Sequence, residues 1–151
     1  MELKDKKVVV VGFGRTGQAV CDFLLSQGAN ITVSDKKSEA ELERVEKYRA
    51  KGVNFETGAN RLETLLAAEL VVLSPGVPPL PEILTAREKG IKVISEIELA
   101  YPYLRGKLIG ITGTNGKSTT TTLIYLMLKK AGFKVHLTGN IGQPLVSFIP
   151  K

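Results

Sequence analysis

The chain has 151 residues, of which 43% are hydrophobic and 24% are charged, so it is long enough for about one globular domain with a buried core. No apolar run reaches the ~20 residues of a membrane span, and the single cysteine, Cys21, excludes an internal disulfide. We expect neither a signal nor a transit peptide, because MELKDKK leads directly into a strand-like segment. The net charge of +6 is spread along the chain and mixed with Glu, so we expect a cytoplasmic protein with neither a nucleic-acid nor a membrane partner.

The first 95 residues contain short β-branched runs bounded by glycine or turn residues, a pattern typical of strands covered on both faces. Five strands are predicted, in the segments KKVVVVG (6–12), NITVSD (30–35), VNFETG (53–58), ELVVLSPG (69–76) and IKVIS (91–95). Strands that alternate with helices predict an α/β fold with a parallel sheet.

Amphipathic stretches between these strands predict four helices, bounded by capping residues, proline or glycine. The first helix ends at Gly28, and the second begins at a capping pair, Ser38 with Glu41, and ends near Gly52. The third begins at Asn60 with Glu63, and the fourth begins at Pro81 and ends at Gly90. Together with the strands they form a complete small Rossmann-like unit.

The pattern restarts after a helical stretch, 96–106, which Pro102 interrupts. A strand KLIGIT (107–112), a helix over about 117–131 and a strand FKVHLTG (133–139) follow, and His136 is expected to pack within that last strand. Two strands cannot form a stable sheet alone, so they either extend the first sheet or begin a longer protein, the reading that we favour. We therefore expect two domains, 1–96 and an incomplete 97–151.

The loop VGFGRTG (11–17) joins the first strand to the first helix and carries a full G-x-G-x-x-G pattern. Its glycines permit a tight turn, a close approach to a diphosphate and close helix packing, and the helix N-terminus faces the anion. Asp35 ends the second strand, where an acidic side chain can accept a hydrogen bond from a ribose hydroxyl. The pattern indicates a diphosphate nucleotide, NAD being the obvious case, but it does not select one nucleotide, and a ligand-free glycine turn is the alternative.

The loop GTNGKST (113–119) follows a predicted strand and opens a predicted helix. Backbone amides of such a loop hold phosphate oxygens, Lys117 supplies a positive charge and the Ser118 hydroxyl can bind Mg²⁺. Ile111 stands where the general P-loop pattern has its first glycine, which disfavours an ordinary kinase or GTPase but not phosphate binding. Thr119 is a further candidate for phosphate contact.

The order and spacing of GFGRTG, SPG (74–76), GTNGKST and GNIG (139–142) resemble the Mur ligases over essentially the whole chain, and most closely the branch that adds D-glutamate. The resemblance implies a Rossmann-like domain that binds a UDP-sugar, followed by the start of a P-loop ATPase domain. The UDP-sugar residues that it implies are Gly14, Arg15, Thr16, Gly17, Asp35, Lys36, Ser74, Gly76 and Asn140. The ATP residues that it implies are Gly113, Thr114, Asn115, Gly116, Lys117, Ser118 and Thr119, with Lys117 and Ser118 in catalysis and Ser118 on the metal.

The reaction that the resemblance implies uses ATP and Mg²⁺ to join D-glutamate to UDP-N-acetylmuramoyl-L-alanine through an acyl phosphate, in peptidoglycan synthesis and in a monomeric full-length enzyme. The acidic metal ligands and the amino-acid domain of that family would lie beyond residue 151, so these residues alone are expected to be inactive in ligation. Three alternatives remain open: an NAD(P)-binding oxidoreductase or sensor, a P-loop kinase, and a non-catalytic UDP-binding module. The first leaves 113–119 without a use, and the second does the same for 11–17.

Overall fold

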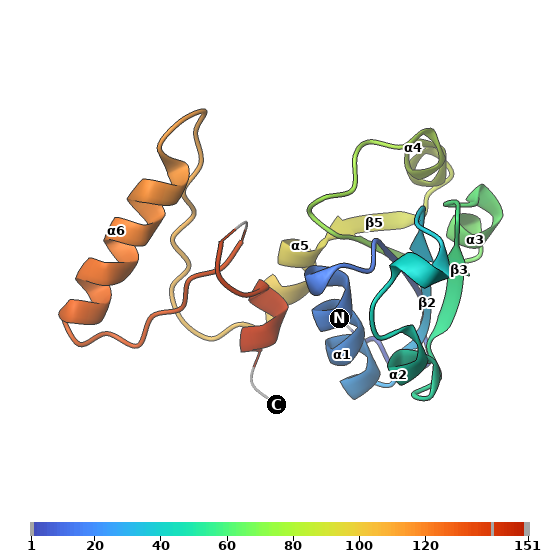
Figure 1. Ribbon diagram of the computed structural model, residues 1–151, viewed down its shortest axis with the longest axis horizontal. Coiled ribbons are helices and arrows are strands. Elements are labelled where there is room, and N and C mark those ends of the chain that lie inside the picture. Colours follow the sequence, from blue (N-terminus) through green and yellow to red (C-terminus); the bar gives the residue numbers. More distant parts are fainter. Residues whose placement is uncertain (1, 140, 150–151) are drawn as a thin grey trace.

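The computed structural model describes residues 2–139 and 141–149, and it places a five-stranded parallel sheet in the first two-thirds of the chain (Figure 1). The strands are β1 (Lys7–Val11), β2 (Asn30–Asp35), β3 (Asn54–Thr57), β4 (Leu70–Leu73) and β5 (Lys92–Ser95). Their order is β3-β2-β1-β4-β5, and every neighbouring pair is parallel. All five strands lie within the predicted segments, and the predicted Rossmann-like parallel sheet is confirmed.

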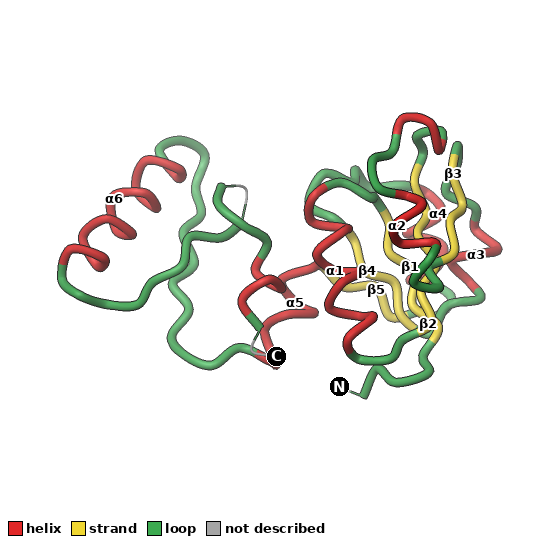
Figure 2. The backbone as a smooth tube through the Cα atoms, turned by 60° about the horizontal axis from the view of Figure 1, so that its bottom comes forward, coloured by secondary structure: helices red, strands yellow, loops and turns green. Residues whose placement is uncertain are grey.

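Strand β1 is the centre of the sheet and has helices over both of its faces (Figure 2). Val8 and Val10 belong to a core formed with α1 (Arg15–Ser26), α2 (Val45–Arg49) and α5 (Glu96–Ala100). Val9 and Val11 face the opposite core, formed with α3 (Leu62–Leu66) and α4 (Pro81–Glu88). Because successive side chains of a strand point to opposite faces, a run of four valines is required to fill both cores.

The second predicted helix is interrupted. Ser38 and Glu41 form the expected capping box, but it closes only a 3-10 turn, Glu39–Glu41. Leu42 then extends to pack against the core, and Arg44 adopts a left-handed backbone with φ of 65° before α2 begins. The extended backbone of the partly buried Leu42 and the left-handed Arg44 thus separate the 3-10 turn from α2.

The third helix begins one residue later than its predicted start. Arg61 is its N-cap, and Glu63 lies in its first turn. The Asn60 side chain is used elsewhere, because its Oδ1 accepts a hydrogen bond from the Ser34 hydroxyl at 2.8 Å. Pro81 opens α4 as predicted.

The second half of the chain forms its predicted helix but not its predicted strands. Helix α6 (Lys117–Lys130) lies apart from the sheet, and 107–112 and 133–139 flank it as extended loops (Figure 1). Within 133–149 the described residues make one isolated bridge, between Thr138 and Gln143. The strand predictions here were wrong because a strand requires a neighbour to complete its hydrogen bonds. His136 therefore packs in no strand; its exposed ring lies 4.3 Å from the Phe148 ring centroid.

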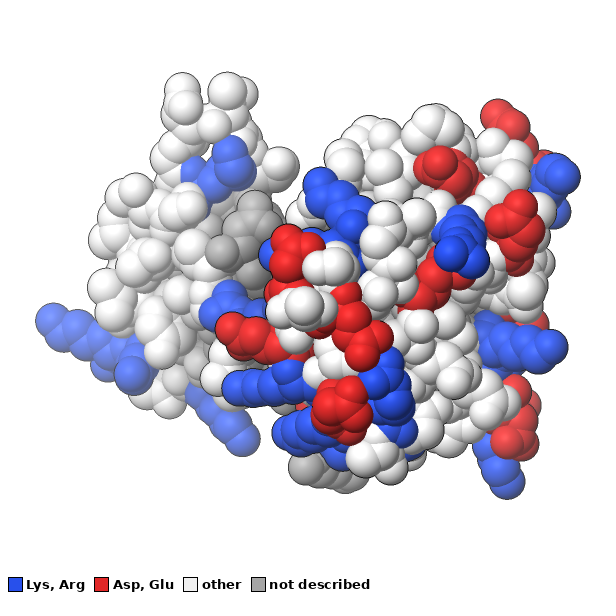
Figure 3. Space-filling view, turned by 45° about the vertical axis from the view of Figure 1, so that its right-hand side comes forward, with Lys and Arg blue, Asp and Glu red and all other residues white. Residues whose placement is uncertain are grey.

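The described part of the chain contains no helix that is long and apolar enough to cross a bilayer. Basic and acidic side chains are intermingled on the face shown in Figure 3, as the sequence predicts. The Cys21 thiol is buried, and this burial raises its pKa to about 12, so it is not a reactive thiolate at neutral pH.

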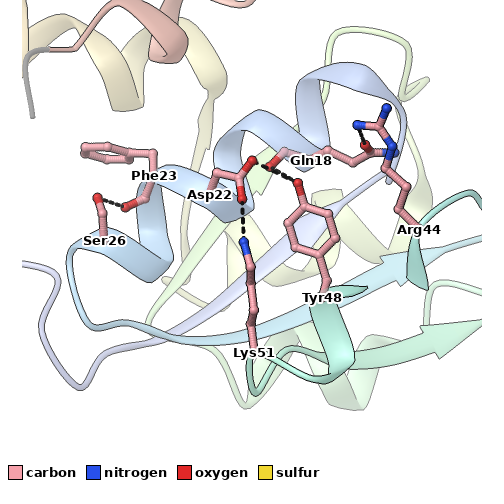
Figure 4. A network of polar contacts seen from close by, with 7 residues as sticks. All are labelled: Gln18, Asp22, Phe23, Ser26, Arg44, Tyr48 and Lys51. Atoms are coloured by element: carbon pink, nitrogen blue, oxygen red, sulfur yellow. Dashed lines mark hydrogen bonds and ion pairs between the residues drawn. The ribbon is translucent and has the colours of Figure 1, made fainter. Parts of the chain in front are cut away.

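A polar network joins α1 to α2 beside the core (Figure 4). The buried Tyr48 donates its hydroxyl proton to Asp22 at 2.9 Å, and the same oxygen lies 3.2 Å from the Gln18 carbonyl. Lys51 reaches the other Asp22 oxygen at 3.4 Å. Burial, together with the neighbouring Asp22, raises the pKa of Tyr48, so its hydroxyl stays protonated and available as a donor.

We expect Tyr48→Phe to lower the free energy of unfolding by about 1 kcal/mol, because it deletes a hydrogen bond to a charged group while keeping the ring in place. Urea denaturation followed by circular dichroism measures the change. Tyr101→Phe is the matched control, because Tyr101 is exposed and the same deletion there removes no buried contact. Equal effects of the two changes would contradict the role of the network.

Candidate functional site

A cleft of about 590 Å³ opens at the carboxyl ends of β1, β2 and β4. This edge of a parallel sheet, where the strand order reverses, is the usual ligand site of such folds. The loops after β1, β2 and β4 form most of it, and Asn60 after β3 and Gly139 from the second half of the chain complete it. The lining residues include Gly12, Phe13, Gly14, Arg15, Thr16, Asp35, Lys36, Lys37, Asn60, Ser74, Pro75, Gly76 and Gly139.

Seven of the nine predicted UDP-sugar residues line this cleft: Gly14, Arg15, Thr16, Asp35, Lys36, Ser74 and Gly76. Gly17 is buried behind the loop in the first turn of α1. Asn140 lies outside the described residues, but its neighbour Gly139 lines the cleft. The structure thus brings together residues that are about 60 positions apart in the sequence.

The glycine loop is held by a close approach of α1 to the end of β1. Gly12 has φ of +89°, and a Cβ added at Gly17 would fall far inside van der Waals contact with the Gly12 carbonyl oxygen. That oxygen accepts a hydrogen bond from the Ser74 hydroxyl at 2.9 Å, which ties the loop after β4 to the loop after β1. By contrast, a Cβ at Gly14 would meet open space, on the side where the cleft lies.

Asp35 is 9% exposed and binds two backbone amides. Its Oδ2 accepts from the Phe13 amide at 2.7 Å and its Oδ1 from the Lys37 amide at 2.9 Å. Both carboxylate oxygens are therefore engaged in holding the loops after β1 and β2 against each other. A pattern search identifies the residue but not this role, because the partners are main-chain groups that the fold brings together.

Charges at the cleft are mixed. Arg15, Lys36 and Lys37 are exposed and favour an anion, whereas Glu41 and Glu43 lie at the rim. Hydrogen bonds from the side chain and amide of Ser38 lower the pKa of Glu41 and keep it ionised. We expect a phosphate group to bind on the glycine-loop side, where backbone amides and the positive end of α1 add to the basic side chains.

Several cleft residues were not predicted as site residues from the sequence. Asn60 was assigned to a helix cap, and Pro75, Val77 and Leu80 carry no chemical signal of their own. Their position in the loops that follow a strand, at the ligand edge of a parallel sheet, is the only signal that could have identified them.

The second predicted loop, 113–119, lies at the start of α6 and lines no part of this cleft. Gly113 and Gly116 have φ of +146° and +74°, which a side chain would strain. The Lys117 ammonium donates to the carbonyl oxygens of Gly113 and Thr114, the latter at 2.9 Å. The structure thus brings the seven predicted ATP residues into one solvent-exposed turn with the ammonium folded over it.

The donor set of this turn fits a magnesium nucleotide. Its backbone amides and Lys117 suit phosphate oxygens, and Ser118 is one oxygen ligand in the first turn of α6. Within 2–139 and 141–149, no three His, Cys, Asp or Glu side chains gather to hold a metal ion. Mg²⁺ usually takes one or two protein oxygens and completes its shell with phosphates and water, so this single hydroxyl is compatible with it.

The fold and the cleft define a class, the Rossmann-like parallel α/β domains with a cleft at the carboxyl edge of the sheet, here followed by the glycine-containing loop 113–119. Residues 6–95 match the family described as Mur ligase MurD-like, N-terminal domain, and 111–147 match the Mur ligase middle domain. The chain belongs to the Mur ligase family, in its MurD-like branch, which confirms the resemblance drawn from the motifs.

A UDP-N-acetylmuramoylalanine–D-glutamate ligase of Desulfatibacillum aliphaticivorans is 47% identical over 150 residues, which cover 98% of this chain and 33% of the relative. The chain thus spans about a third of the length of the curated relatives that it matches. A pseudomurein peptide ligase type C from Methanothermus fervidus superimposes with a TM-score of 0.60 at 27% identity, over 97% of this chain and 31% of that one.

A precorrin-2 dehydrogenase is also similar in structure, with a TM-score of 0.53 at 20% identity over 89% of this chain and 69% of that one. Identity at this level shows a shared fold alone. A dehydrogenase and a ligase can therefore carry the same sheet, and the ligand must be argued from the residues of the cleft.

We expect Gly17→Ala to destabilise the protein by about 3 kcal/mol, because the added methyl group must push α1 away from the Gly12 carbonyl. Chemical denaturation gives the free energy of unfolding. Gly14→Ser is the matched control: its side chain enters open space and serine suits the N-cap position, so the change should stay within about 0.5 kcal/mol. A Gly17→Ala protein as stable as the control would refute the close approach.

Proposed function

We propose that this chain forms the N-terminal part of an ATP-dependent amide ligase that joins D-glutamate to UDP-N-acetylmuramoyl-L-alanine in peptidoglycan synthesis. The observation that carries the proposal is the cleft at the carboxyl edge of the sheet, in which the glycine loop, the Asp35 loop and the SPG loop converge. The names of the relatives supply the substrate class. Within this proposal, 1–96 binds the UDP-sugar and 97–151 begins the ATP domain.

In the proposed complex the UDP diphosphate lies against the backbone of 14–17 at the N-terminus of α1. Arg15 and Lys36 add positive charge at the rim, and Ser74 and Gly76 close the opposite wall. Asp35 holds the loops that contact the uridine, and Asn140 would approach the diphosphate from the second domain.

ATP, which would bind with Mg²⁺ at 113–119, would transfer its γ-phosphoryl group to the carboxylate of the alanyl residue; the bond between the γ-phosphorus and the β-phosphate oxygen breaks, and ADP leaves as the acyl phosphate forms. The amine of D-glutamate attacks the acyl carbon, a C–N bond forms, the C–O bond to phosphate breaks and the amine proton is released. The contribution of this chain is positioning and charge: Lys117 neutralises phosphate oxygens, and Ser118 holds the metal.

The loop 113–119 favours this reading over an NAD-binding oxidoreductase, because the oxidoreductase alternative leaves that loop without a ligand. Recognition of a nicotinamide nucleotide by the glycine motif uses the carboxylate at the end of the second strand to accept from a ribose hydroxyl. The Phe13 and Lys37 amides take one position on each Asp35 oxygen and leave a second position on each, so Asp35 alone does not decide between the two ligands.

We expect UDP to bind the cleft more tightly than NADH, by at least about tenfold, in isothermal titration calorimetry. Gly14→Leu should abolish UDP binding while the protein stays folded, because the side chain enters the open space in front of the loop. Gly110→Leu is the matched control, since it also fills open space but lies outside the cleft. Tighter binding of NADH than of UDP would overturn the proposal.

We also expect no D-glutamate-dependent release of phosphate from ATP when this chain is incubated with UDP-N-acetylmuramoyl-L-alanine and Mg²⁺. The loop 113–119 is open to solvent, and a phosphoryl transfer needs a site that excludes water. A phosphate assay measures the outcome, with the full-length Desulfatibacillum aliphaticivorans ligase as the positive control. Turnover above background would show that the chain is a complete catalyst.

A further inference from the structure

Glu96 is a buried carboxylate that takes no part in the cleft or in the ATP loop. It is 3% exposed, at the first position of α5. Its Oε1 accepts a hydrogen bond of 2.6 Å from the Val146 amide, 50 residues further along the chain. Burial raises the pKa of Glu96, whereas the Val146 and Leu145 amides act in the opposite direction and stabilise the charge. A buried carboxylate must be compensated by such donors, so this contact is specific.

The segment that Glu96 holds comes from the second half of the chain but packs on the first. The 3-10 turn Leu145–Phe148 contacts both α1 and α5, beside which it lies in Figure 1. Leu145 and Val146 are buried in the core that also contains Phe23 of α1. Hydrophobic burial holds the segment on this surface but does not set its position along it, because it has no direction. The hydrogen bonds from the Val146 and Leu145 amides to Glu96 are directional, and they set the position of the segment along the surface.

A closed turn connects this docked segment to the cleft. Thr138 and Gln143 form a bridge, and the Gln143 amide donates to the Leu137 carbonyl at 3.3 Å. Gly142 has φ of +82°, and a Cβ there would collide with the same carbonyl, so Gly142 packs closely against Leu137. Gly139, near its tip, lines the cleft. The position of the 3-10 turn therefore determines where Gly139 lies.

We propose that Glu96 is a positioning residue for the nucleotide cleft. By fixing the amides of Leu145 and Val146 it sets the docked segment, and through the contacts of Gly142 and Gln143 with Leu137 and Thr138 it places Gly139 at the cleft. The ligand affected is the diphosphate nucleotide, so this inference rests on the proposed function. Glu96 contacts no ligand itself; it acts through the chain that returns from the second half.

The test compares UDP binding to the intact chain and to three variants by titration calorimetry. Glu96→Ala should weaken UDP binding about tenfold, because the segment loses its directed acceptor. Glu96→Gln should restore binding to within about threefold, since the amide oxygen can accept from Val146. Glu98→Ala is the matched control: Glu98 lies two residues further along α5, but it is exposed and its hydrogen bonds are those of the capping box with Ser95.

Amide chemical shifts separate positioning from a loss of stability. In the intact chain, UDP should shift the amide resonances of both Gly14 and Gly139. In Glu96→Ala, UDP at saturation should still shift Gly14 but should move Gly139 by less than half as much. Equal UDP affinity of Glu96→Ala and Glu98→Ala, or an unchanged Gly139 response, would overturn the inference.

A milder variant keeps the test decisive if Glu96→Ala does not fold. Glu96→Asp retains the charge but withdraws the acceptor by one methylene group, so UDP binding should fall about threefold and the Gly139 response should weaken. Wild-type behaviour of Glu96→Asp in both measurements would refute the role of the contact. If UDP shifts neither Gly14 nor Gly139 in the intact chain, the proposed function fails, and this result is distinct from a failure at Glu96.

Discussion

The close contact between the start of α1 and the end of β1 is the constraint on which the site depends. Because Gly17 has no side chain, the first turn of α1 can rest against the Gly12 carbonyl. The amides at the helix N-terminus then face outward at the sheet edge, where they can bind an anion. Asp35 and Ser74 hold the two neighbouring loops to the same turn through hydrogen bonds with the Phe13 amide and the Gly12 carbonyl. One steric requirement thus shapes three loops.

The sequence predicted the first unit well because its signals are local. β-Branched runs identified the strands, and the glycine pattern located a loop that lines the cleft. The exceptions were decided by distant partners. Leu42 packs into the core and breaks a helix that its capping box should have started, and Asn60 bonds to Ser34 instead of capping α3. The Glu96 contact, which spans 50 residues, has no local signal at all.

In the second half of the chain, local sequence signals did not predict the structure of the apolar segments. Its apolar runs 107–112 and 133–139 have the composition of strands, yet they stay unpaired because the described chain offers them no neighbouring strand. Helix α6 forms nonetheless, since a helix satisfies its own backbone. Its apolar side chains remain in solvent, and Met127 is 66% exposed. Local propensity can therefore build the helix of a P-loop motif but not the sheet that normally supports it.

The folded-back ammonium of Lys117 has a consequence for nucleotide affinity. The ammonium donates hydrogen bonds to the carbonyl oxygens of Gly113 and Thr114. A phosphate that bound this loop would have to break these hydrogen bonds before it could pair with Lys117. Breaking these hydrogen bonds would offset part of the binding free energy between phosphate and Lys117. In the proposed ATP site, a phosphate would therefore have to replace two neutral carbonyl oxygens as the partner of Lys117.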